Sequence, residues 1–386
     1  MNLLSRREFV KAAAAAVPLR TLAAQDAPKI YRGCVIGHTG RGWYGHALDT
    51  AFLKFPNISI VGVADPDEKG RLEAARRLKA ANSYADYREM LEKEKPNLVA
   101  ICPYYVERRL EMVQAAAEVG AHIFLEKPMA QSLEEADAMV AVAEKHKIKS
   151  VLAHQPRVAP SILHLKKLLD DGLIGDLLEV RTRGKEDGRA GGEDLMVLGW
   201  HCLYLMRYFA GEPLWCSARV MQGGKEVTVE DRRAPTMPIG PVAGDAIHAS
   251  YAFPKGVQGH FASQKNHGPG RGSDFQVVLY GAKGVVQIHI AGAHVYHLAD
   301  PIWSPGRSGA AWQPIAAPGG GRSGNEALVA DLLRAIETDG QSVASLQEGR
   351  GVLEMIMGVY ASHLQGGRAA FPLKDRRHPL GSLNNK

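Results

Sequence analysis

The tripeptide Glu126-Lys127-Pro128 carries the side chain of this chain best suited to chemistry. It directly follows the apolar run 121–125, whose composition predicts a buried strand. A lysine placed there lies at the carboxyl edge of a parallel sheet, where open α/β folds bind their ligands. Beside a bound dinucleotide, the Lys127 ammonium group can exchange a proton with a hydroxyl group that is being oxidised. We therefore predict that Lys127 is catalytic; a lysine of a surface loop is the alternative.

A glycine-rich turn lies earlier in the chain, after the predicted strand 30–36. Gly37, Thr39 and Gly42 take the three places of the pattern G-x-G-x-x-G, with threonine in the second place. Such turns let a pyrophosphate approach main-chain N–H groups at the start of a helix, and the sequence predicts a helix over 43–53. The predicted dinucleotide contacts of this turn are Gly37, Thr39, Gly40, Arg41 and Gly42.

The second apolar run, 58–64, ends in an acid, Asp65. A carboxylate at this place accepts hydrogen bonds from the adenosine ribose and repels a 2′-phosphate, which predicts NAD and makes NADP the less favoured cofactor. A turn or helix-cap role for Asp65 is equally compatible with the sequence. Arg41 acts in the opposite direction, since a nearby arginine favours the extra phosphate.

A third unit repeats the same order of elements. The run 97–102 predicts a buried strand, Pro103 ends it, and 106–119 predicts a helix. Strands that alternate with helices in this way predict a right-handed series of βαβ units and a doubly wound parallel sheet. Tyr104 and Tyr105 then lie at the ligand-binding edge, where we predict a cofactor contact for Tyr104 and a substrate contact for Tyr105. Packing is the alternative for both.

With these motifs in this order, the chain resembles the glucose–fructose oxidoreductase/inositol dehydrogenase/MocA (Gfo/Idh/MocA) family, from about residue 29 to about residue 373. The resemblance implies an α/β fold with an N-terminal Rossmann domain. It also implies a C-terminal α+β domain with an open, mainly antiparallel sheet. Lys127 is by this resemblance the catalytic proton carrier, in contact with cofactor and substrate, and Pro103 and Glu126 belong to the cofactor site.

The family has a second signature, an aspartate four residues before a histidine on a helix. His201 matches the histidine, but Val197 stands at the aspartate position. Residues four apart share one face of a helix, so the carboxylate has to come from elsewhere. We predict Asp194, one turn earlier, as the catalytic partner of His201, with Glu193 as the alternative. Where the family often has a histidine four residues beyond the proline, this chain has Glu107, which we interpret as a helix-start acid.

The second domain is predicted to begin near residue 153, where the last parallel strand ends. Several strands with hairpin-like turns follow between 177 and 297, and two helices, 326–338 and 346–365, close the domain. Polar side chains ahead of His201, together with Arg157, suit the hydroxyl groups of a sugar or polyol. The predicted substrate contacts are Tyr105, Arg157, Lys185 and Asp187. A solvated loop is the alternative for 183–192.

The first 25 residues predict the cellular localisation of the protein. The segment 5–11 is similar to a twin-arginine export signal, and Ala23-Ala24 offers a cleavage site. The apolar run 12–17 is too short to span a bilayer. We therefore expect an exported, for example periplasmic, protein that folds around a tightly held cofactor before export. A flexible basic tail is the alternative. The predicted parts are a signal at 1–25, a dinucleotide-binding domain at 28–152, a substrate and oligomerisation domain at 153–373 and a tail at 374–386.

Composition narrows the class of protein. The formal net charge is +6, and residues 1–25 contribute +3 of it, which leaves about +3 and gives no reason to expect a nucleic-acid partner. The four cysteines have no metal-like spacing, and two of them fall in predicted core strands. His294 and His297 lie three apart on a predicted strand and so point to opposite faces, and we predict no metal site.

The sequence leaves three functions open. The first is an exported NAD-dependent oxidoreductase that acts on a sugar, polyol or glycoside hydroxyl group, with Lys127 as proton carrier and His201 assisting. The second is redox-neutral glycoside cleavage by oxidation, elimination and reduction on a retained cofactor. The third is a cofactor-binding partner or sensor protein with little turnover. A homo-oligomer through the C-terminal sheet is expected from the resemblance alone.

Overall fold

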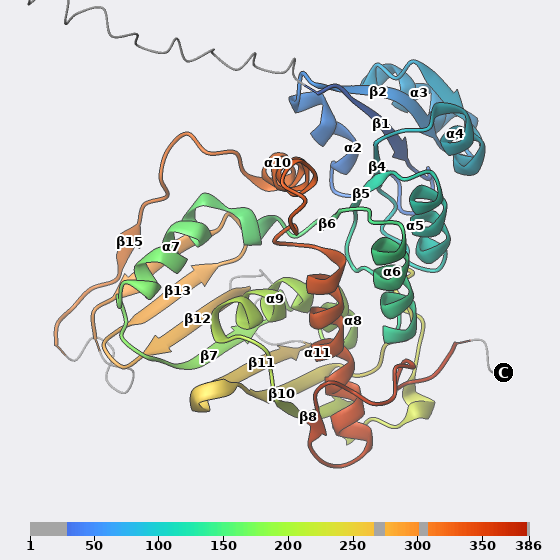
Figure 1. The fold of residues 1–386 in the computed structure, drawn as a ribbon. Coiled ribbons are helices and arrows are strands. Elements are labelled where there is room, and N and C mark those ends of the chain that lie inside the picture. The colour runs from blue at the N-terminus through green and yellow to red at the C-terminus, as the bar shows by residue number, and fades with distance from the viewer. Residues whose placement is uncertain (1–28, 266–274, 301–307, 384–386) are drawn as a thin grey trace, which may run out of the picture. The chain divides into compact units, whose positions relative to one another are not determined.

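The computed structural model describes residues 29–265, 275–300 and 308–383, in which two β-sheets form the framework (Figure 1). The predicted export signal therefore lies outside the described residues. The first sheet is parallel, with the strand order β3-β2-β1-β4-β5-β6. Its strands are β1 (Tyr31–Ile36), β2 (Ile58–Ala64), β3 (Asn82–Tyr84), β4 (Leu98–Ile101), β5 (His122–Leu125) and β6 (Ser150–Leu152). This order is that of a doubly wound dinucleotide-binding sheet, as predicted.

Helices connect these parallel strands. They are α2 (Leu48–Ala51), the 3-10 turn η1 (Phe52–Lys54), α3 (Glu68–Leu78), α4 (Tyr87–Glu94), α5 (Arg109–Glu118) and α6 (Leu133–Lys145). The side chains of Asp67, Asp86 and Ser132 cap α3, α4 and α6 by accepting backbone N–H bonds. These caps explain why the strands end in short loops at the ligand-binding edge.

The predicted helix 43–53 is wrong over its first half. The chain instead forms consecutive turns up to residue 47, and only the short α2 and η1 follow. Trp43 and Ala47 adopt positive φ angles, as do Gly42 and Gly45, and this conformation is incompatible with a continuous right-handed helix. The turn after β1 is therefore longer than the usual dinucleotide-binding turn.

The second sheet has ten strands in the order β15-β14-β13-β12-β7-β11-β10-β8-β16, with β9 pairing to β8. Every recorded pairing in it is antiparallel except that of β7 with β11, which confirms the mainly antiparallel sheet expected for the C-terminal part. The strands are β7 (Leu177–Arg183), β8 (Trp215–Gln222), β9 (Lys225–Glu226), β10 (Ala246–Ala252), β11 (Gln258–Gln264), β12 (Gln276–Gly281), β13 (Val285–His289), β14 (His294–Leu298), β15 (Gln313–Ile315) and β16 (Ala369–Ala370).

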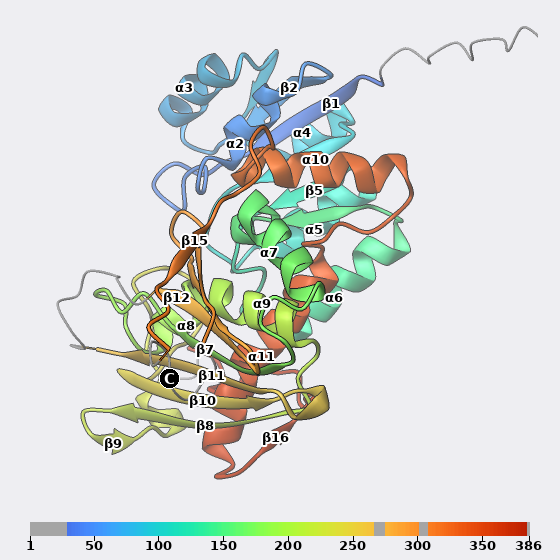
Figure 2. The same ribbon diagram turned by 90° about the vertical axis from the view of Figure 1, so that its left-hand side faces the viewer.

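Helices cover one face of this sheet. In Figure 2, α9 and α11 lie on the side of the sheet that faces the first sheet, and no helix of the described segments covers the other side. The helices and 3-10 turns of this part are η2 (Gln155–Val158), α7 (Pro160–Asp170), α8 (Gly192–Val197), α9 (Gly199–Ala210), η3 (Val229–Asp231), η4 (Pro254–Gly256), α10 (Gly324–Glu337) and α11 (Leu346–Leu364). All four cysteines are buried and free.

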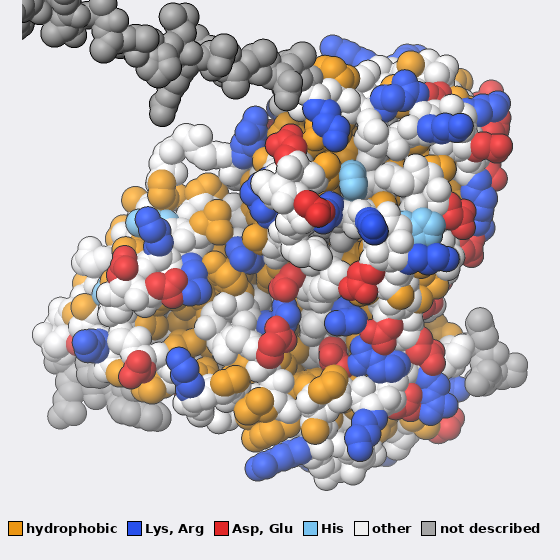
Figure 3. All heavy atoms as spheres, viewed as in Figure 1, with side chains coloured by type: hydrophobic (Ala, Val, Ile, Leu, Met, Phe, Trp, Pro, Cys, Tyr) orange, Lys and Arg blue, Asp and Glu red, His pale blue; other side chains and the backbone are white. Residues whose placement is uncertain are grey.

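The surface is mixed in charge. On the face shown in Figure 3, Lys and Arg side chains are interspersed with Asp and Glu side chains over both sheets' helices. Among the described residues, none of the helices is long and apolar enough to cross a membrane.

Candidate active site

The parallel topology brings the glycine turn, the β4 loop and the β5 loop to one edge of the first sheet. Gly42 and Gly45 touch these loops so closely that a Cβ atom would lie 2.8 Å from the Tyr104 nitrogen and 2.5 Å from the Cys102 oxygen, respectively. Both glycines also have positive φ. Close packing against the β4 loop, together with the backbone conformation, explains why glycine is required at these two places.

Asp65 lies at the end of β2, as predicted, but its carboxylate is fully buried. It accepts hydrogen bonds from the Thr39 nitrogen at 3.0 Å and hydroxyl at 2.7 Å, from the Tyr44 hydroxyl at 2.9 Å and from the Asp67 nitrogen at 3.0 Å. The Tyr44 ring also covers Gly37, where a Cβ atom would lie 2.2 Å from a ring carbon. The ribose contact predicted for Asp65 is thus replaced in this conformation by contacts within the protein.

A hollow of about 250 Å³ lies beside Asp65, at the carboxyl edge where doubly wound sheets bind their ligands. Its walls come from the turn after β1, the ends of β2 and β3, the start of α4 and one side of α5. Tyr105 is one of the lining residues, with the Arg41 guanidinium group 4.7 Å above its ring. Tyr105 therefore lies at the hollow beside Asp65, and the substrate contact predicted for it stays a prediction. Arg41 is paired with Glu107 at 3.1 Å.

Tyr104, which precedes Tyr105 in the same loop, faces the other way. Its ring lies 6.2 Å from the rings of both Trp43 and His46. The rest of the loop is held by Arg109, a buried side chain that the sequence analysis did not single out. Arg109 donates hydrogen bonds to the carbonyl oxygens of Pro103, Tyr105, Glu126 and Pro128. One guanidinium group thus joins the β4 loop to the Glu-Lys-Pro loop.

Glu126 is fully buried, and its two carboxylate oxygens differ. Oε1 lies 2.5 Å from Nδ1 of His46, whose side chain is half exposed, whereas Oε2 has no hydrogen-bond partner among the described residues. A buried acceptor without a partner is costly and marks a place where a ligand donor belongs. This oxygen fits the cofactor contact predicted for Glu126.

Lys127 lies next to it, 5% exposed, with its ammonium nitrogen 3.3 Å from the carbonyl oxygen of Val197. Val197 is the last residue of α8, where helix carbonyl groups lack partners within the helix. Burial lowers the pKa of Lys127, and the nearby Arg189 and Arg109 lower it further, whereas Glu126 acts in the opposite direction. Burial and the two arginines thus favour the neutral amine, which is the form of Lys127 that can accept a proton.

His201 lies on α9 close to Lys127, and its Nδ1 has no hydrogen-bond partner in the described part of the chain. Burial is the main reason that its pKa lies well below the usual value, and His154 and Lys127 lower it further. His154 follows β6 at the same sheet edge, with ring centroids 5.0 Å apart between the two imidazoles. The site thus holds an amine and two neutral imidazoles.

Asp194 has a different environment from the one predicted. Its buried carboxylate accepts hydrogen bonds from the Ser263 hydroxyl at 2.6 Å and from the backbone nitrogens of Lys185 and Glu186 at 3.2 and 3.1 Å. Burial raises its pKa. These contacts anchor the segment after β7, so the structure gives Asp194 a positioning role for that segment and not a contact with the reacting groups.

The remaining predicted substrate residues surround this centre. Asp187 forms a two-pronged pair with Arg189, and hydrogen bonding to Arg189 lowers the pKa of Asp187 to about 2. The amine of Lys185 lies 3.5 Å from Asp187. Arg157, on η2, stacks 3.8 Å above the Tyr208 ring, two turns along α9 from His201. Lys185 and Asp187 are thus paired, whereas Arg157 has no recorded ion pair and its buried Nη1 has no hydrogen-bond partner among the described residues.

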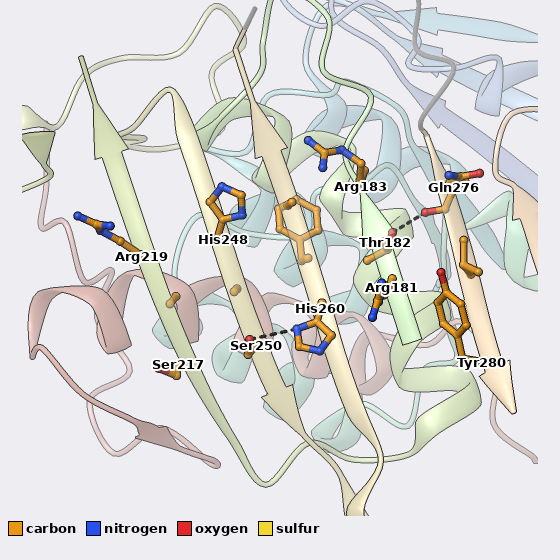
Figure 4. Close-up of a pocket in the computed structure, with 15 residues that line it drawn as sticks. Arg181, Thr182, Arg183, Ser217, Arg219, His248, Ser250, His260, Gln276 and Tyr280 are labelled. Carbon is orange, nitrogen blue, oxygen red and sulfur yellow. Dashed lines mark hydrogen bonds between the residues drawn. The ribbon is translucent and has the colours of Figure 1, made fainter. Parts of the chain in front are cut away.

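Two larger hollows lie elsewhere. One of about 600 Å³ is bounded by η2, the start of α7 and strands β14 and β15. The other, of about 620 Å³, lies on the face of the second sheet that carries no helices, where Figure 4 shows Arg181, Arg219, His248 and His260 projecting from neighbouring strands. Within the described segments, no three His, Cys, Asp or Glu side chains come together in a way that would hold a metal ion.

Three functional candidates were missed from the sequence. His154 directly follows the last parallel strand, and that position at the ligand-binding edge is a signal that could have identified it. His46 lies within the misassigned helix, so its approach to Glu126 could not be anticipated. For Arg109 the sequence contains no signal, because its partners are backbone carbonyl groups of two distant loops.

Comparisons with known proteins agree with this architecture. Residues 33–154 match the family model described as "Oxidoreductase family, NAD-binding Rossmann fold", and residues 162–287 match the model "GFO/IDH/MocA C-terminal domain". Together the two matches cover more than half of the chain.

Individual relatives are more distant. Levoglucosan dehydrogenase of Pseudarthrobacter phenanthrenivorans is 26% identical over 286 residues, which is 65% of this chain and 72% of the relative. A levoglucosan dehydrogenase structure in complex with NADH and levoglucosan has a TM-score of 0.72 and 21% identity, covering 89% of this chain and all of that one. An aldose-aldose oxidoreductase from Caulobacter crescentus has a TM-score of 0.70 and 18% identity, with coverage of 89% and 100%. At such identities the two structures establish the common fold.

Proposed function

Because the chain belongs to the Gfo/Idh/MocA oxidoreductase family, we propose that it oxidises a hydroxyl-bearing carbon of a sugar, polyol or glycoside, with NAD as hydride acceptor. The protein is an NAD-binding oxidoreductase acting on CH–OH groups. In the proposed reaction, Lys127 takes the hydroxyl proton as hydride leaves the same carbon. His201 hydrogen-bonds to the substrate.

The observation that carries this proposal is the environment of Lys127. A general base must be unprotonated before the reaction, and burial among cations favours the neutral amine of Lys127. The Val197 carbonyl group orients the amine without adding the negative charge that an aspartate would bring. The substitution that departs from the family signature therefore supports the role of Lys127 as a base.

Several side chains are suited to hold the cofactor. The 250 Å³ hollow accepts the adenosine half, the turn around Gly40 faces open space, and the unpartnered Oε2 of Glu126 accepts a donor beside Lys127. When bound, NAD supplies the hydride acceptor. Asp65 makes no free hydrogen bond available, but its negative charge beside the hollow still disfavours a 2′-phosphate, which is why we propose NAD over NADP.

Substrate class, cellular address and assembly are further parts of the proposal. The levoglucosan and aldose enzymes among the relatives favour a carbohydrate substrate. The twin-arginine-like segment favours export with a tightly bound cofactor. The hollowed, helix-free face in Figure 4 is the surface that we propose for pairing with a second copy of the chain.

The first test is chemical. Protein purified after native export is denatured, and released nucleotide is identified by mass spectrometry, with NAD or NADH expected in stoichiometric amount. The same protein is then supplied with NAD and a panel of sugars, anhydrosugars and glycosides, and NADH is followed at 340 nm. Glycoside cleavage without accumulated NADH would indicate the redox-neutral variant. Failure to bind NAD or NADP and to turn over any member of the panel would contradict the proposal.

A further inference from the structure

The imidazole of His154 is an unusual buried group. The side chain is fully buried, and neither Nδ1 nor Nε2 has a hydrogen-bond partner among the described residues. Backbone groups of Trp200 and of His154 itself lie beside the ring and act to raise its pKa, but neither meets the geometry of a hydrogen bond to a ring nitrogen. Buried polar groups are nearly always paired, so an imidazole with two unpaired nitrogens requires an explanation.

Packing holds this ring rigidly in place. It lies on the Tyr204 ring with centroids 3.7 Å apart and meets the His201 ring nearly edge-on at 5.0 Å. Its backbone nitrogen donates to the Leu152 oxygen at 2.7 Å, which fixes the residue at the end of β6. An apolar ring would make the same stacking contacts, so packing alone does not account for a histidine here.

The charged groups around His154 exclude a role as a cation. The nearest ones that act on it are Arg157 and Lys127, both positive, and together with burial they lower its pKa to about 3. His154 is therefore neutral, with one N–H donor and one lone-pair acceptor. This combination matches a hydroxyl group, which donates and accepts at once.

His201 resembles His154 in this respect, since its Nδ1 is also buried and has no hydrogen-bond partner within the described segments. The two imidazoles adjoin Lys127 at the carboxyl edge of the parallel sheet, where the substrate of this fold binds. Two imidazoles with ring nitrogens that have no hydrogen-bond partner among the described residues therefore lie beside Lys127.

We propose that His154 is a substrate-binding residue, which together with His201 forms a pair of neutral imidazoles that bind adjacent hydroxyl groups of a polyhydroxylated substrate beside Lys127. This inference rests on the proposed function and specifies its substrate class: a sugar or polyol with hydroxyl groups on neighbouring carbons. A substrate with one isolated hydroxyl group would leave one imidazole unpaired.

The test is that replacing His154 should increase thermal stability and decrease activity. Replacing His154 by Phe keeps the ring on Tyr204 and removes the unpaired nitrogens, and His154→Leu serves as a second variant in case the phenylalanine ring is too large. We expect Tm to rise by at least about 2 °C in the full-length protein, because a buried unsatisfied group is removed. We also expect kcat/KM for the best sugar to fall at least tenfold, while the Kd for NAD stays within twofold.

His378→Phe is the matched control. His378 also packs with a tilted ring on a tyrosine, Tyr360, but its Nδ1 accepts a hydrogen bond from the Leu380 nitrogen. In this control Tm should fall and kcat/KM should not change.

The proposal is overturned if both His154 variants have a lower Tm, or if kcat/KM is unchanged in a variant that folds. The Tm comparison needs no turnover, so it tests His154 even if the wild-type protein oxidises no sugar, an outcome that counts against the proposed function instead.

Discussion

Asp65 and the residues around Lys127 lie on the same edge of one sheet, yet the buried polar atoms of these two regions differ in their hydrogen bonding. Asp65 receives hydrogen bonds from three residues of its own chain and is fully buried. Around Lys127, by contrast, Glu126, His154 and His201 are buried and carry atoms that have no hydrogen-bond partner among residues 29–265, 275–300 and 308–383. The protein supplies hydrogen-bond donors to the Asp65 carboxylate, whereas it leaves atoms of the other three side chains without described partners.

This difference separates architecture from chemistry. A satisfied buried group stabilises the fold, and its loss is felt as instability. An unsatisfied buried group costs stability, so its retention points to a ligand that completes it. On this reasoning Asp65 mainly stabilises the turn after β1. The reaction takes place near Lys127, where buried polar atoms lack hydrogen-bond partners.

The largest effect is expected for Lys127→Met, since the base is removed and burial keeps the pKa values of the neighbouring His154 and His201 too low for these imidazoles to replace it. Turnover should fall about 10²–10⁴-fold with NAD binding preserved, as measured by steady-state kinetics and by nucleotide titration. Lys149→Met, which changes a lysine paired with Asp339 on the surface, is the control. Turnover within twofold of wild type would favour a cofactor-binding protein without catalysis.

Arg109→Lys should have the next largest effect. A lysine keeps the charge but cannot reach carbonyl groups on two loops, so Lys127 and Tyr104 lose their alignment. We expect kcat to fall by up to about 10²-fold with less change in KM. The matched variant is Arg377→Lys, because Arg377 pairs with Asp375 at the surface. Equal kinetics for the two variants would show that Arg109 does not position the site.

Val197→Asp tests the charge of the site. A carboxylate beside Lys127 favours the ammonium form and raises its pKa. Since the amine must be neutral, the fall in kcat/KM toward low pH should move to higher pH. At pH values below the pKa of Lys127, the rate of Val197→Asp should be roughly tenfold lower than that of wild type for each pH unit by which this pKa rises. At high pH the two rates should become equal. Val197→Ala keeps the carbonyl group and should leave the pH profile in place. If the pH dependence of kcat/KM were the same in Val197→Asp as in wild type, the ionisation of Lys127 would not determine it.

The smallest effect on activity is expected for Tyr44→Phe. It removes one donor to Asp65 and should lower the free energy of unfolding by about 1.5–3 kcal/mol, as measured by urea denaturation. The preference for NAD over NADP should change less than threefold. A large change in that preference with unaltered stability would instead place Asp65 and Tyr44 in direct nucleotide recognition.

The sequence predicted the fold well because its signals are local. Apolar runs such as 58–64 and 98–101 are buried on both faces, and such runs identify parallel strands. The helix at 43–53 failed because glycines and positive φ angles override an amphipathic pattern. Lys127 could be identified from its place after β5.

The partners of the site residues could not be identified from the sequence. Whether Lys127 meets a carboxylate or the Val197 carbonyl group, and whether Asp194 faces His201 or Ser263, depends on side-chain directions across distant segments. Asp65 shows the same limit: its position was predictable, but its saturation by Thr39 and Tyr44 depends on the unexpected shape of the turn.

The most direct test of the account is the pH dependence of hydride transfer from sugar to NAD, followed at 340 nm between pH 5 and 10 in wild type and Lys127→Met. We predict that the wild-type rate falls toward low pH, with an apparent pKa below the usual value for lysine. The residual rate of Lys127→Met should show no such fall. The same limb in both proteins would contradict the assignment of Lys127 as the base.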